Sequence, residues 1–202
     1  MFRVEESVGH RRQQDHYGRR AKSDGYAARS VYKLEEIQKR FQVVPKNGAV
    51  LDLGCSPGSW SNYVKRVGGP DTSIVGVDLT EVSGYLGKQF IGSVFDVPDQ
   101  ELRDALGGGA DLVMSDMAPA TSGNRFTDHV RQIELAEQAR VLASRLLRPG
   151  GHFVVKVFEG EDATGLVARI RADFGKTKRV KPKAVRKESV EFFVVGLGRR
   201  GD

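Results

Sequence analysis

The chain has 202 residues, which is enough for one ordinary domain with a buried core. Hydrophobic residues make up 39% and charged residues 29%, as in globular, water-soluble proteins, and no apolar run reaches the roughly 20 residues that would span a bilayer. The composition therefore excludes a membrane-spanning protein, and the net charge of +6 favours a polyanionic partner.

The basic residues gather in two segments that lie far apart in the sequence. The first contains Arg11, Arg12, Arg19, Arg20, Lys22 and Arg29, and the second contains Lys176, Lys178, Arg179, Lys181, Lys183, Arg186 and Lys187. Basic side chains that contact phosphates release counterions, so two such segments indicate nucleic acid as a partner. Basic segments that only keep the protein soluble are the alternative, and composition alone does not decide between them.

The N-terminal residues and the single cysteine bear on the cellular compartment. Residues 1–20 are polar and charged and lack the apolar segment of a secretory signal. Cys55 has no second cysteine with which to form an internal disulfide. We therefore expect a cytoplasmic protein. A monomer, without a membrane and without a metal site, is a separate expectation.

From the N-terminus onward, the pattern predicts a short arm followed by one domain. Residues 1–25 form a basic arm that is expected to be irregular or only partly helical. Over Ala27–Phe41, apolar residues recur at helical spacing and predict an amphipathic helix. No internal repeat or Pro/Ser-rich linker follows, so residues 26–202 are predicted to form a single domain.

Beyond this helix, short apolar runs alternate with helical patterns. The runs predict strands at Ala49–Leu53, Ser73–Val77, Asp111–Ser115, His152–Phe158 and Glu191–Leu197. A helix is expected over Asp128–Arg148, where Pro149-Gly150-Gly151 stops it, and Leu166, Ile170 and Phe174 form a shorter helical stripe. This alternation predicts an α/β fold with a mostly parallel sheet and helices on both faces.

Polar residues follow several of the predicted strands. Asp52, Asp78, Asp116 and Lys156 each lie at or near the end of an apolar run. Ligands of such sheets bind beyond the carboxyl ends of the strands, so these four side chains are candidates for a binding or catalytic site.

The segment from Val50 to Trp60 predicts a strand, a glycine-containing turn and a helix. Gly54 and Gly58 let the backbone approach a ligand closely, and Asp78 is placed to bind ribose hydroxyls. The loop lacks both the G-x-G-x-x-G pattern and the Lys-Ser/Thr of a phosphate loop, which favours a nucleoside-like ligand without a diphosphate. A tight strand–helix connection without a ligand is the alternative for the turn. Trp60 has two compatible interpretations, as a core anchor or as part of the ligand pocket.

Four motifs in this order resemble the FtsJ/RrmJ (RlmE) family, which methylates ribose 2′-hydroxyls in large-subunit ribosomal RNA. They are D-L-G-C-S-P-G-S-W from Asp52, S-D-M-A-P from Ser115, V-V-K-V-F-E-G from Val154 and R-K-E-S-V-E from Arg186. Together with S-V-Y-K-L-E-E-I from Ser30, the resemblance covers the chain from about Tyr17 to Arg199. It implies a Rossmann-like methyltransferase fold, S-adenosylmethionine as cofactor, and ribosomal RNA or the large ribosomal subunit as partner.

The resemblance also implies roles for particular residues. The family's catalytic Lys-Asp-Lys-Glu corresponds to Lys33, Asp116, Lys156 and Glu191, and its cofactor residues correspond to Gly58, Trp60, Asp78 and Asp116. Where the family has Gly-Asp-Phe near the adenine, this chain has Ser93-Val94-Phe95. The adenine contact is therefore assigned either to the Phe95 backbone or, with a shifted loop, to Asp96.

The chemistry explains why these residue types are needed. The methyl donor is a sulfonium, and an alcohol attacks it well only as its proton is removed. A lysine can take that proton only in the neutral form, which burial and a neighbouring cation both favour. In this interpretation Lys156 is the base, Lys33 is the neighbouring cation, and Asp116 and Glu191 orient the two amines.

Other functions remain open at this stage. Each of the four residues could be an ordinary surface or turn residue, and only their joint occurrence favours catalysis. A methyltransferase of the same superfamily that acts on transfer RNA is the nearest alternative. A catalytically silent RNA-binding factor in ribosome assembly would need the basic segments but not the four residues. An NAD-type oxidoreductase is disfavoured by the missing glycine pattern.

Overall fold

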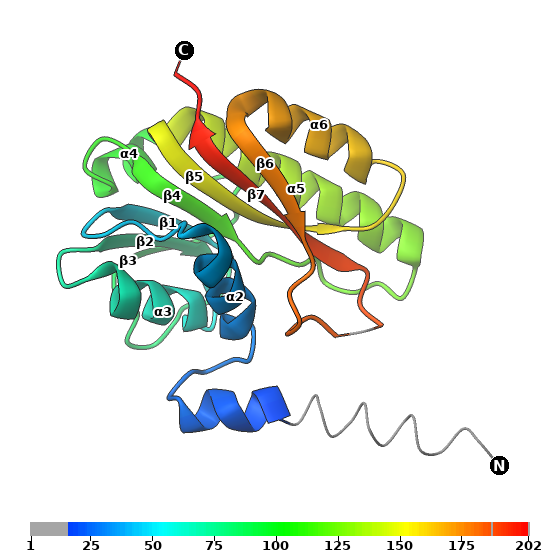
Figure 1. The fold of residues 1–202 in the computed structure, drawn as a ribbon, viewed down its shortest axis with the longest axis horizontal. Coiled ribbons are helices and arrows are strands. Elements are labelled where there is room, and N and C mark those ends of the chain that lie inside the picture. The colour runs from blue at the N-terminus through cyan, green and yellow to red at the C-terminus, as the bar shows by residue number, and fades with distance from the viewer. Residues whose placement is uncertain (1–15, 187, 202) are drawn as a thin grey trace.

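A seven-stranded sheet forms the centre of the protein in the computed structural model, which describes residues 16–186 and 188–201 (Figure 1). Its strand order is β3-β2-β1-β4-β5-β7-β6. The strands are β1 Ala49–Leu53, β2 Ser73–Asp78, β3 Lys88–Ile91, β4 Ala110–Ser115, β5 Leu147–Phe158, β6 Phe174–Val180 and β7 Glu191–Arg199. The first five are parallel, and β7 is antiparallel to both β5 and β6.

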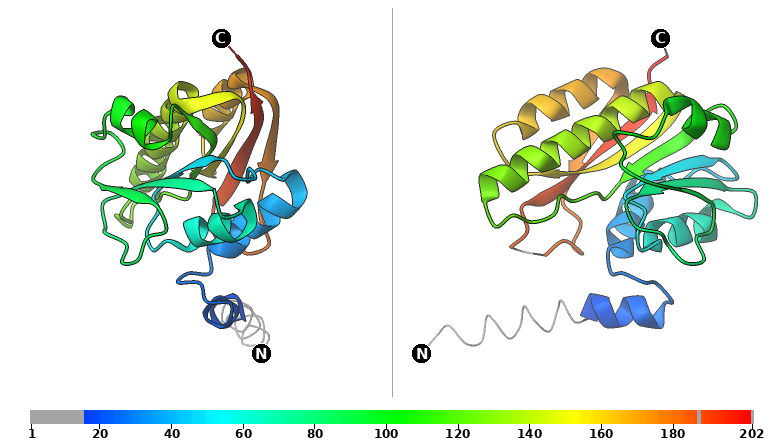
Figure 2. Two further views of the ribbon diagram at one scale, coloured as in Figure 1. Left: turned by 90° about the vertical axis from the view of Figure 1, so that its left-hand side faces the viewer. Right: turned by 180° about the vertical axis from the view of Figure 1, so that it is seen from behind.

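Helices cover both faces of this sheet, as predicted (Figure 2). The helices α2 Val31–Phe41 and α3 Ser59–Gly68 lie on one face, and α4 Asp99–Ala105, α5 Arg125–Leu146 and α6 Ala163–Asp173 lie on the other. Successive strand residues point to opposite faces, which divides the core in two. Val50 packs in the cluster beneath α2 and α3, whereas Leu51 and Leu53 pack in the cluster beneath α5. The predicted α/β fold with a mostly parallel sheet is confirmed.

Three elements were absent from the sequence prediction. The strands β3 and β6 and the short helix α4 lie where loops or a basic segment were expected. The assignment of Phe174 to a helical stripe was wrong, because α6 ends at Asp173 and Phe174 begins β6. The helix expected to stop at Pro149 ends earlier, since β5 already begins at Leu147 and pairs there with Ala110.

The described part of the predicted arm is helical and packed. Residues 16–23 form a helix beside α2, in which Ala21 is 2% exposed and the Tyr17 ring lies 5.5 Å from the Tyr32 ring. The Arg20 guanidinium lies over the same Tyr32 ring and pairs with Glu35. Residues 1–15, the rest of the predicted arm, lie outside the described residues. No helix in the described segments is both long enough and apolar enough to cross a membrane.

Candidate active site

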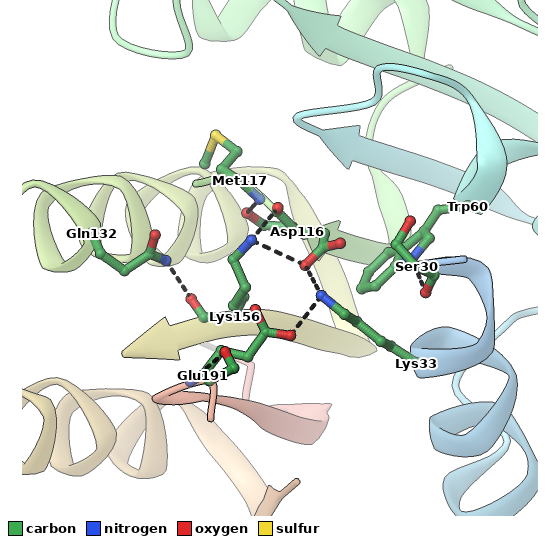
Figure 3. Close-up of polar contacts among 10 residues, drawn as sticks. Ser30, Lys33, Trp60, Asp116, Met117, Gln132, Lys156 and Glu191 are labelled. Atoms are coloured by element: carbon green, nitrogen blue, oxygen red, sulfur yellow. Dashed lines mark hydrogen bonds and ion pairs between the residues drawn. The ribbon is translucent and has the colours of Figure 1, made fainter. Parts of the chain in front are cut away.

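Four charged side chains meet beyond the carboxyl ends of β4 and β5 (Figure 3). They are Lys33, Asp116, Lys156 and Glu191, here called the lysine–carboxylate cluster. Lys33 comes from α2, Asp116 directly follows β4, Lys156 lies in β5, and Glu191 begins β7. The antiparallel register places Glu191 opposite Phe158, two residues beyond Lys156. The topology thus unites residues that are up to 158 positions apart in the sequence.

Asp116 contacts both lysines of this cluster. Its Oδ1 lies 3.4 Å from Lys33 Nζ and 3.2 Å from Lys156 Nζ, so both ammonium groups contact the same oxygen. Lys156 Nζ also donates a hydrogen bond of 2.6 Å to the Asp116 carbonyl oxygen. Lys33 also pairs with a second carboxylate, since its Nζ lies 2.7 Å from Glu191 Oε1.

The two lysines are buried, and they contact different numbers of carboxylates. Lys33 is 9% exposed and Lys156 is 5% exposed. Desolvation lowers the pKa of Lys33, but the carboxylates of Asp116 and Glu191 more than offset this effect, and the pKa is raised above its ordinary value. Within the described residues, Lys156 pairs with one carboxylate, that of Asp116, which it shares with Lys33. The raised pKa keeps Lys33 protonated.

The start of α3 fixes the entry to α2 and with it the position of Lys33. The Trp60 indole N–H donates a hydrogen bond of 2.9 Å to the Ser30 carbonyl, and Ser59 Oγ accepts one of 2.7 Å from the Ala28 backbone. The Trp60 ring is 4% exposed and lies 5.9 Å from the Phe193 ring. Trp60 is thus a core residue that connects α3, α2 and the sheet.

A cavity of about 360 Å³ opens next to the cluster, and we call it the strand-end cavity. This volume lies within the roughly 300–1,000 Å³ of typical small-molecule sites. Its lining residues are Gly54, Ser56, Val77, Asp78, Leu79, Gly92, Ser93, Val94, Asp116, Met117, Ala118 and Leu135. Asp116 belongs to both the cavity and the lysine–carboxylate cluster, so a molecule in the cavity lies beside the two lysines.

The Asp78 carboxylate is held in place by backbone donors. Its Oδ2 accepts a hydrogen bond from Ser56 N and its Oδ1 accepts one from Thr80 N, both of 2.9 Å. Each carboxylate oxygen has further acceptor capacity, which can serve a ligand's hydroxyl groups. Gly54, at φ 78°, lets Met117 approach, because a Cβ there would lie 2.6 Å from Met117 Cγ.

The structure places the other predicted cofactor residues differently. Gly58 is the N-cap of α3 at φ 90° and, like Trp60, does not line the cavity. Phe95 is 55% exposed and Asp96 is exposed, and neither belongs to the lining. The cavity wall at this point is made by Ser93 and Val94, and Val94 is 6% exposed.

Asp52 and Cys55 lie behind the glycine turn, outside the cavity lining. Asp52 is 1% exposed, and burial raises its pKa to about 7, although Ser61 Oγ donates to it at 2.6 Å. Asp52 therefore faces Ser61 rather than a ligand at the strand end. Burial also raises the pKa of Cys55 to about 12, which keeps it a thiol.

Sequence reasoning missed several residues that build the site. Gln132 on α5 is 1% exposed and donates a hydrogen bond of 2.9 Å from Nε2 to the Lys156 carbonyl, which anchors β5 beside the cluster. Leu135, also on α5, lines the cavity. Gln132 is a polar residue among the buried apolar residues of α5, and this is the signal that could have indicated a special contact.

A second hollow borders the cluster on the side of α2. It has a volume of about 420 Å³ and is lined by Arg29, Ser30, Lys33, Arg186, Glu188, Ser189 and Glu191, and we call it the Arg29–Arg186 hollow. Burial and the neighbouring Arg186 guanidinium lower the pKa of Arg29. The carboxylates of Glu191 and Glu188 act on Arg29 in the opposite direction. Within residues 16–186 and 188–201, there is no group of three or more His, Cys, Asp or Glu side chains that could hold a metal ion.

Known proteins match this chain over a region that includes the whole candidate site. Residues 26–199 match the FtsJ-like methyltransferase family. The ribosomal RNA large subunit methyltransferase E of Desulfosudis oleivorans is 45% identical over 193 residues, which cover 94% of this chain and 93% of that protein. The protein of the same name from Bdellovibrio bacteriovorus is 44% identical and covers 92% of this chain and 97% of its own length.

A solved structure agrees with these sequence matches. It comes from Plasmodium falciparum, is described as a ribosomal RNA methyltransferase, and superposes with a TM-score of 0.77 at 25% sequence identity. The superposition covers 88% of this chain and 100% of that chain. The matched residues 26–199 include all four members of the lysine–carboxylate cluster and the full lining of the strand-end cavity.

Proposed function

Because the chain belongs to the FtsJ-like methyltransferase family, we propose that it transfers a methyl group from S-adenosylmethionine to a ribose 2′-hydroxyl, that of a uridine, in large-subunit ribosomal RNA. The observation that carries the proposal is the lysine–carboxylate cluster, in which two buried lysines share the carboxylate of Asp116. Relatives named as ribosomal RNA large subunit methyltransferases support the substrate class.

The strand-end cavity fits S-adenosylmethionine by its charge. Its lining contains the carboxylates of Asp78 and Asp116 but no lysine or arginine, which suits a cationic nucleoside and not a diphosphate. We infer that Asp78 binds the ribose hydroxyls and that Leu79 and Val94 pack against the adenine. When bound, this cofactor supplies a methyl group on a sulfonium, which is electrophilic.

The cluster accounts for removal of the proton from the ribose hydroxyl. A general base must be neutral, and Lys156 is the better candidate because it shares its acid, whereas Lys33 is held protonated by two acids. Asp116 and Glu191 orient the two amines and balance their charge. The Lys33 ammonium stands beside the same Asp116 oxygen and thereby favours the neutral form of Lys156.

The Arg29–Arg186 hollow supports an RNA substrate. The guanidinium groups of Arg29 and Arg186 border a hollow that also contains Lys33 and Glu191. Arginine binds phosphate oxygens through several N–H donors at once. We infer that a phosphate of the substrate strand binds there, which brings the neighbouring ribose to the lysine–carboxylate cluster.

A labelling experiment tests the proposed function. The protein is incubated with S-adenosylmethionine carrying a labelled methyl group and, in separate reactions, with large ribosomal subunits, free large-subunit ribosomal RNA and transfer RNA. We expect label in ribosomal RNA, at the 2′-oxygen of a uridine, after nuclease digestion and mass spectrometry. Label on a base, or in transfer RNA alone, would overturn the assignment, and binding of RNA without methylation would favour a silent assembly factor.

A further inference from the structure

Loop 79–87 joins β2 to β3 and forms part of the wall of the strand-end cavity through Leu79. Seven of its nine residues are exposed, and only Val82 and Tyr85 are partly buried. Gln89 of β3 holds the loop backbone at two points, accepting a hydrogen bond from Val82 N and donating one to Thr80 O, but little of the loop's own surface is buried. Whatever fixes it also fixes one wall of the cavity.

Tyr85 connects this loop to two other elements through a chain of hydroxyl groups. Tyr85 Oη lies 2.7 Å from Ser61 Oγ on α3, and Ser61 Oγ lies 2.6 Å from Asp52 Oδ2 on β1. Ser61 is 0% exposed and Asp52 is 1% exposed, so two of these three groups lie in the interior. We call this chain of contacts the Asp52–Ser61–Tyr85 relay.

The sheet leaves room for the tyrosine at one position. Gly76 lies beside Asp52 in the β1–β2 register, and a Cβ at Gly76 would collide with Tyr85 Oη. The hydroxyl therefore occupies the space that a side chain of β2 would fill. Val82, the other partly buried residue of the loop, approaches the glycine turn, since a Cβ at Gly58 would lie 3.1 Å from Val82 Cγ1.

The protons of the relay fix its direction. Ser61 has one hydroxyl proton, so when it donates to the Asp52 carboxylate, Tyr85 must donate to Ser61. If Asp52 is protonated, the chain can run in the opposite sense and stays complete. Burial raises the pKa of Tyr85, so its hydroxyl keeps its proton throughout. Tyr85 is thus bound to Ser61 in either protonation state of Asp52.

We propose that the Asp52–Ser61–Tyr85 relay holds loop 79–87 against the sheet and thereby sets the affinity of the strand-end cavity for the methyl donor. Tyr85 is then a positioning residue, which acts on the cofactor through Leu79 and Asp78 and does not take part in proton transfer. The identity of the ligand in this proposal rests on the proposed function. The contact between the loop and the sheet is independent of that function.

The test compares Tyr85→Phe, Ser61→Ala and the double variant with the wild-type protein. Tyr85→Phe keeps the ring and removes only the hydroxyl. We expect amide hydrogen exchange of residues 80–87 in the free protein to rise about threefold to tenfold, as for the loss of one buried hydrogen bond. The KM for S-adenosylmethionine is expected to rise by a similar factor with kcat within about twofold, because the lysine–carboxylate cluster is untouched.

Two comparisons separate a relay from ordinary packing. The double variant is expected to be no worse than the more affected single variant, because either change already breaks the chain. Tyr63→Phe, which removes another tyrosine hydroxyl from the same face of the molecule, is the matched control and should leave exchange and KM unchanged. Wild-type exchange and KM in Tyr85→Phe would overturn the proposal, as would effects that add in the double variant.

Failure of the proposed function would be recognised separately. Calorimetry with S-adenosylhomocysteine shows whether the wild-type protein binds this class of nucleoside. If it binds none, the proposed function and the cofactor part of the relay proposal both fail. The exchange measurement needs no ligand, so it still decides whether the relay fixes the loop.

Discussion

Asp116 takes part in both halves of the candidate site. Its carboxylate contacts both lysines, and the same residue lines the strand-end cavity. Under the proposed function, one side chain therefore lies between the cofactor and the two amines. Lys33 contacts two carboxylates and Lys156 contacts one. In the proposed function, this difference is the reason for taking Lys156 as the base and Lys33 as the neighbouring cation.

Lys156→Ala tests the base directly. We expect the variant to fold and to bind S-adenosylhomocysteine normally, while single-turnover methyl transfer falls by about 10²–10⁴-fold, the usual contribution of a general base. Lys156→Arg should not restore the rate, because a guanidinium stays protonated at any accessible pH. Near-normal activity of Lys156→Arg would instead make Lys156 an orienting cation.

Lys33→Ala tests the neighbouring cation. Removing it leaves the Asp116 carboxylate to Lys156 alone and takes away a nearby positive charge, and both changes favour protonated Lys156. The pH–rate profile should therefore shift to higher pH, with the largest loss of rate at the acidic end. Lys39→Ala, on the same helix but exposed and paired with Glu35, is the control and should leave the profile in place. An unshifted profile for Lys33→Ala would exclude this role.

Asp52 makes a prediction about stability. Its pKa in the folded protein is raised to about 7 from an ordinary value of 3.8, so the fold favours the neutral acid. A raised pKa gives stability that is present below the ordinary value and is lost as pH rises through about 7. Asparagine cannot ionise, so the variant Asp52→Asn does not lose this stability. The unfolding free energy of Asp52→Asn minus that of the wild type should therefore be larger at pH 8 than at pH 4 by on the order of 4 kcal/mol. Urea unfolding at both pH values measures this difference, and equal differences would contradict it.

At the scale of elements, the predicted and observed strands agree where burial is strong. The strands β1, β2, β4, β5 and β7 were expected from runs of β-branched residues, and all five contain long stretches of buried side chains. The polar ends of these strands also gave Asp78, Asp116 and Lys156 from the sequence. Parallel topology then places their carboxyl ends at one edge.

The missed elements carry little apolar signal. None of the four residues of β3 is fully buried, and α4 buries only Leu102. β6 buries only its end residues, Phe174 and Val180, so its lysines and arginine were interpreted as a basic segment. An edge strand of this kind is held by backbone pairing with β7, which side-chain periodicity does not reveal.

The cofactor residues illustrate the same limit. Gly58 and Trp60 were assigned to the cofactor by the family motif and Asp96 by a shifted loop, yet none of them lines the strand-end cavity. Met117, in the turn after β4, and Leu135, on α5, line it because those two elements pack against the cavity. Three-dimensional packing of that kind leaves no pattern in a single sequence.

Trp60→Phe tests how α3 positions α2. The change removes the hydrogen bond to the Ser30 carbonyl and part of a buried ring, so we expect a loss of about 1–3 kcal/mol in unfolding free energy. Because Lys33 follows Ser30 by three residues on α2, kcat should fall while the affinity for S-adenosylhomocysteine stays within about twofold. A large loss of affinity with unchanged kcat would instead return Trp60 to the cofactor pocket.

At the scale of the whole molecule, parts of the two basic segments lie close together, because residues 16–23 and the loop after β6 both approach α2 (Figure 1). The helix at residues 16–23 and the loop after β6 both pack around α2, where Glu36 accepts a hydrogen bond of 2.7 Å from Lys183 N. Arg29 and Arg186, one from each segment, line the same hollow beside the cluster. Under the proposed function, this surface is the one that we expect to contact the RNA backbone.

Substitution of Lys181 and Lys183 by glutamine tests this surface. Each phosphate contact that is lost should lower the slope of log Kd against log salt by about 0.7–0.9, so the double variant should show a slope smaller by about 1 to 2 and weaker RNA binding at low salt. Lys46→Gln with Lys88→Gln is the matched control, because these exposed lysines lie at the opposite, amino ends of β1 and β3 and remove the same charge. Filter binding of a ribosomal RNA fragment over a range of salt concentrations measures both slopes. Since the strand-end cavity contains no lysine, neither variant should change the affinity for S-adenosylhomocysteine. Equal slopes in the two variants would mean that RNA responds to net charge alone, and the convergence of the basic segments would then have no part in substrate binding.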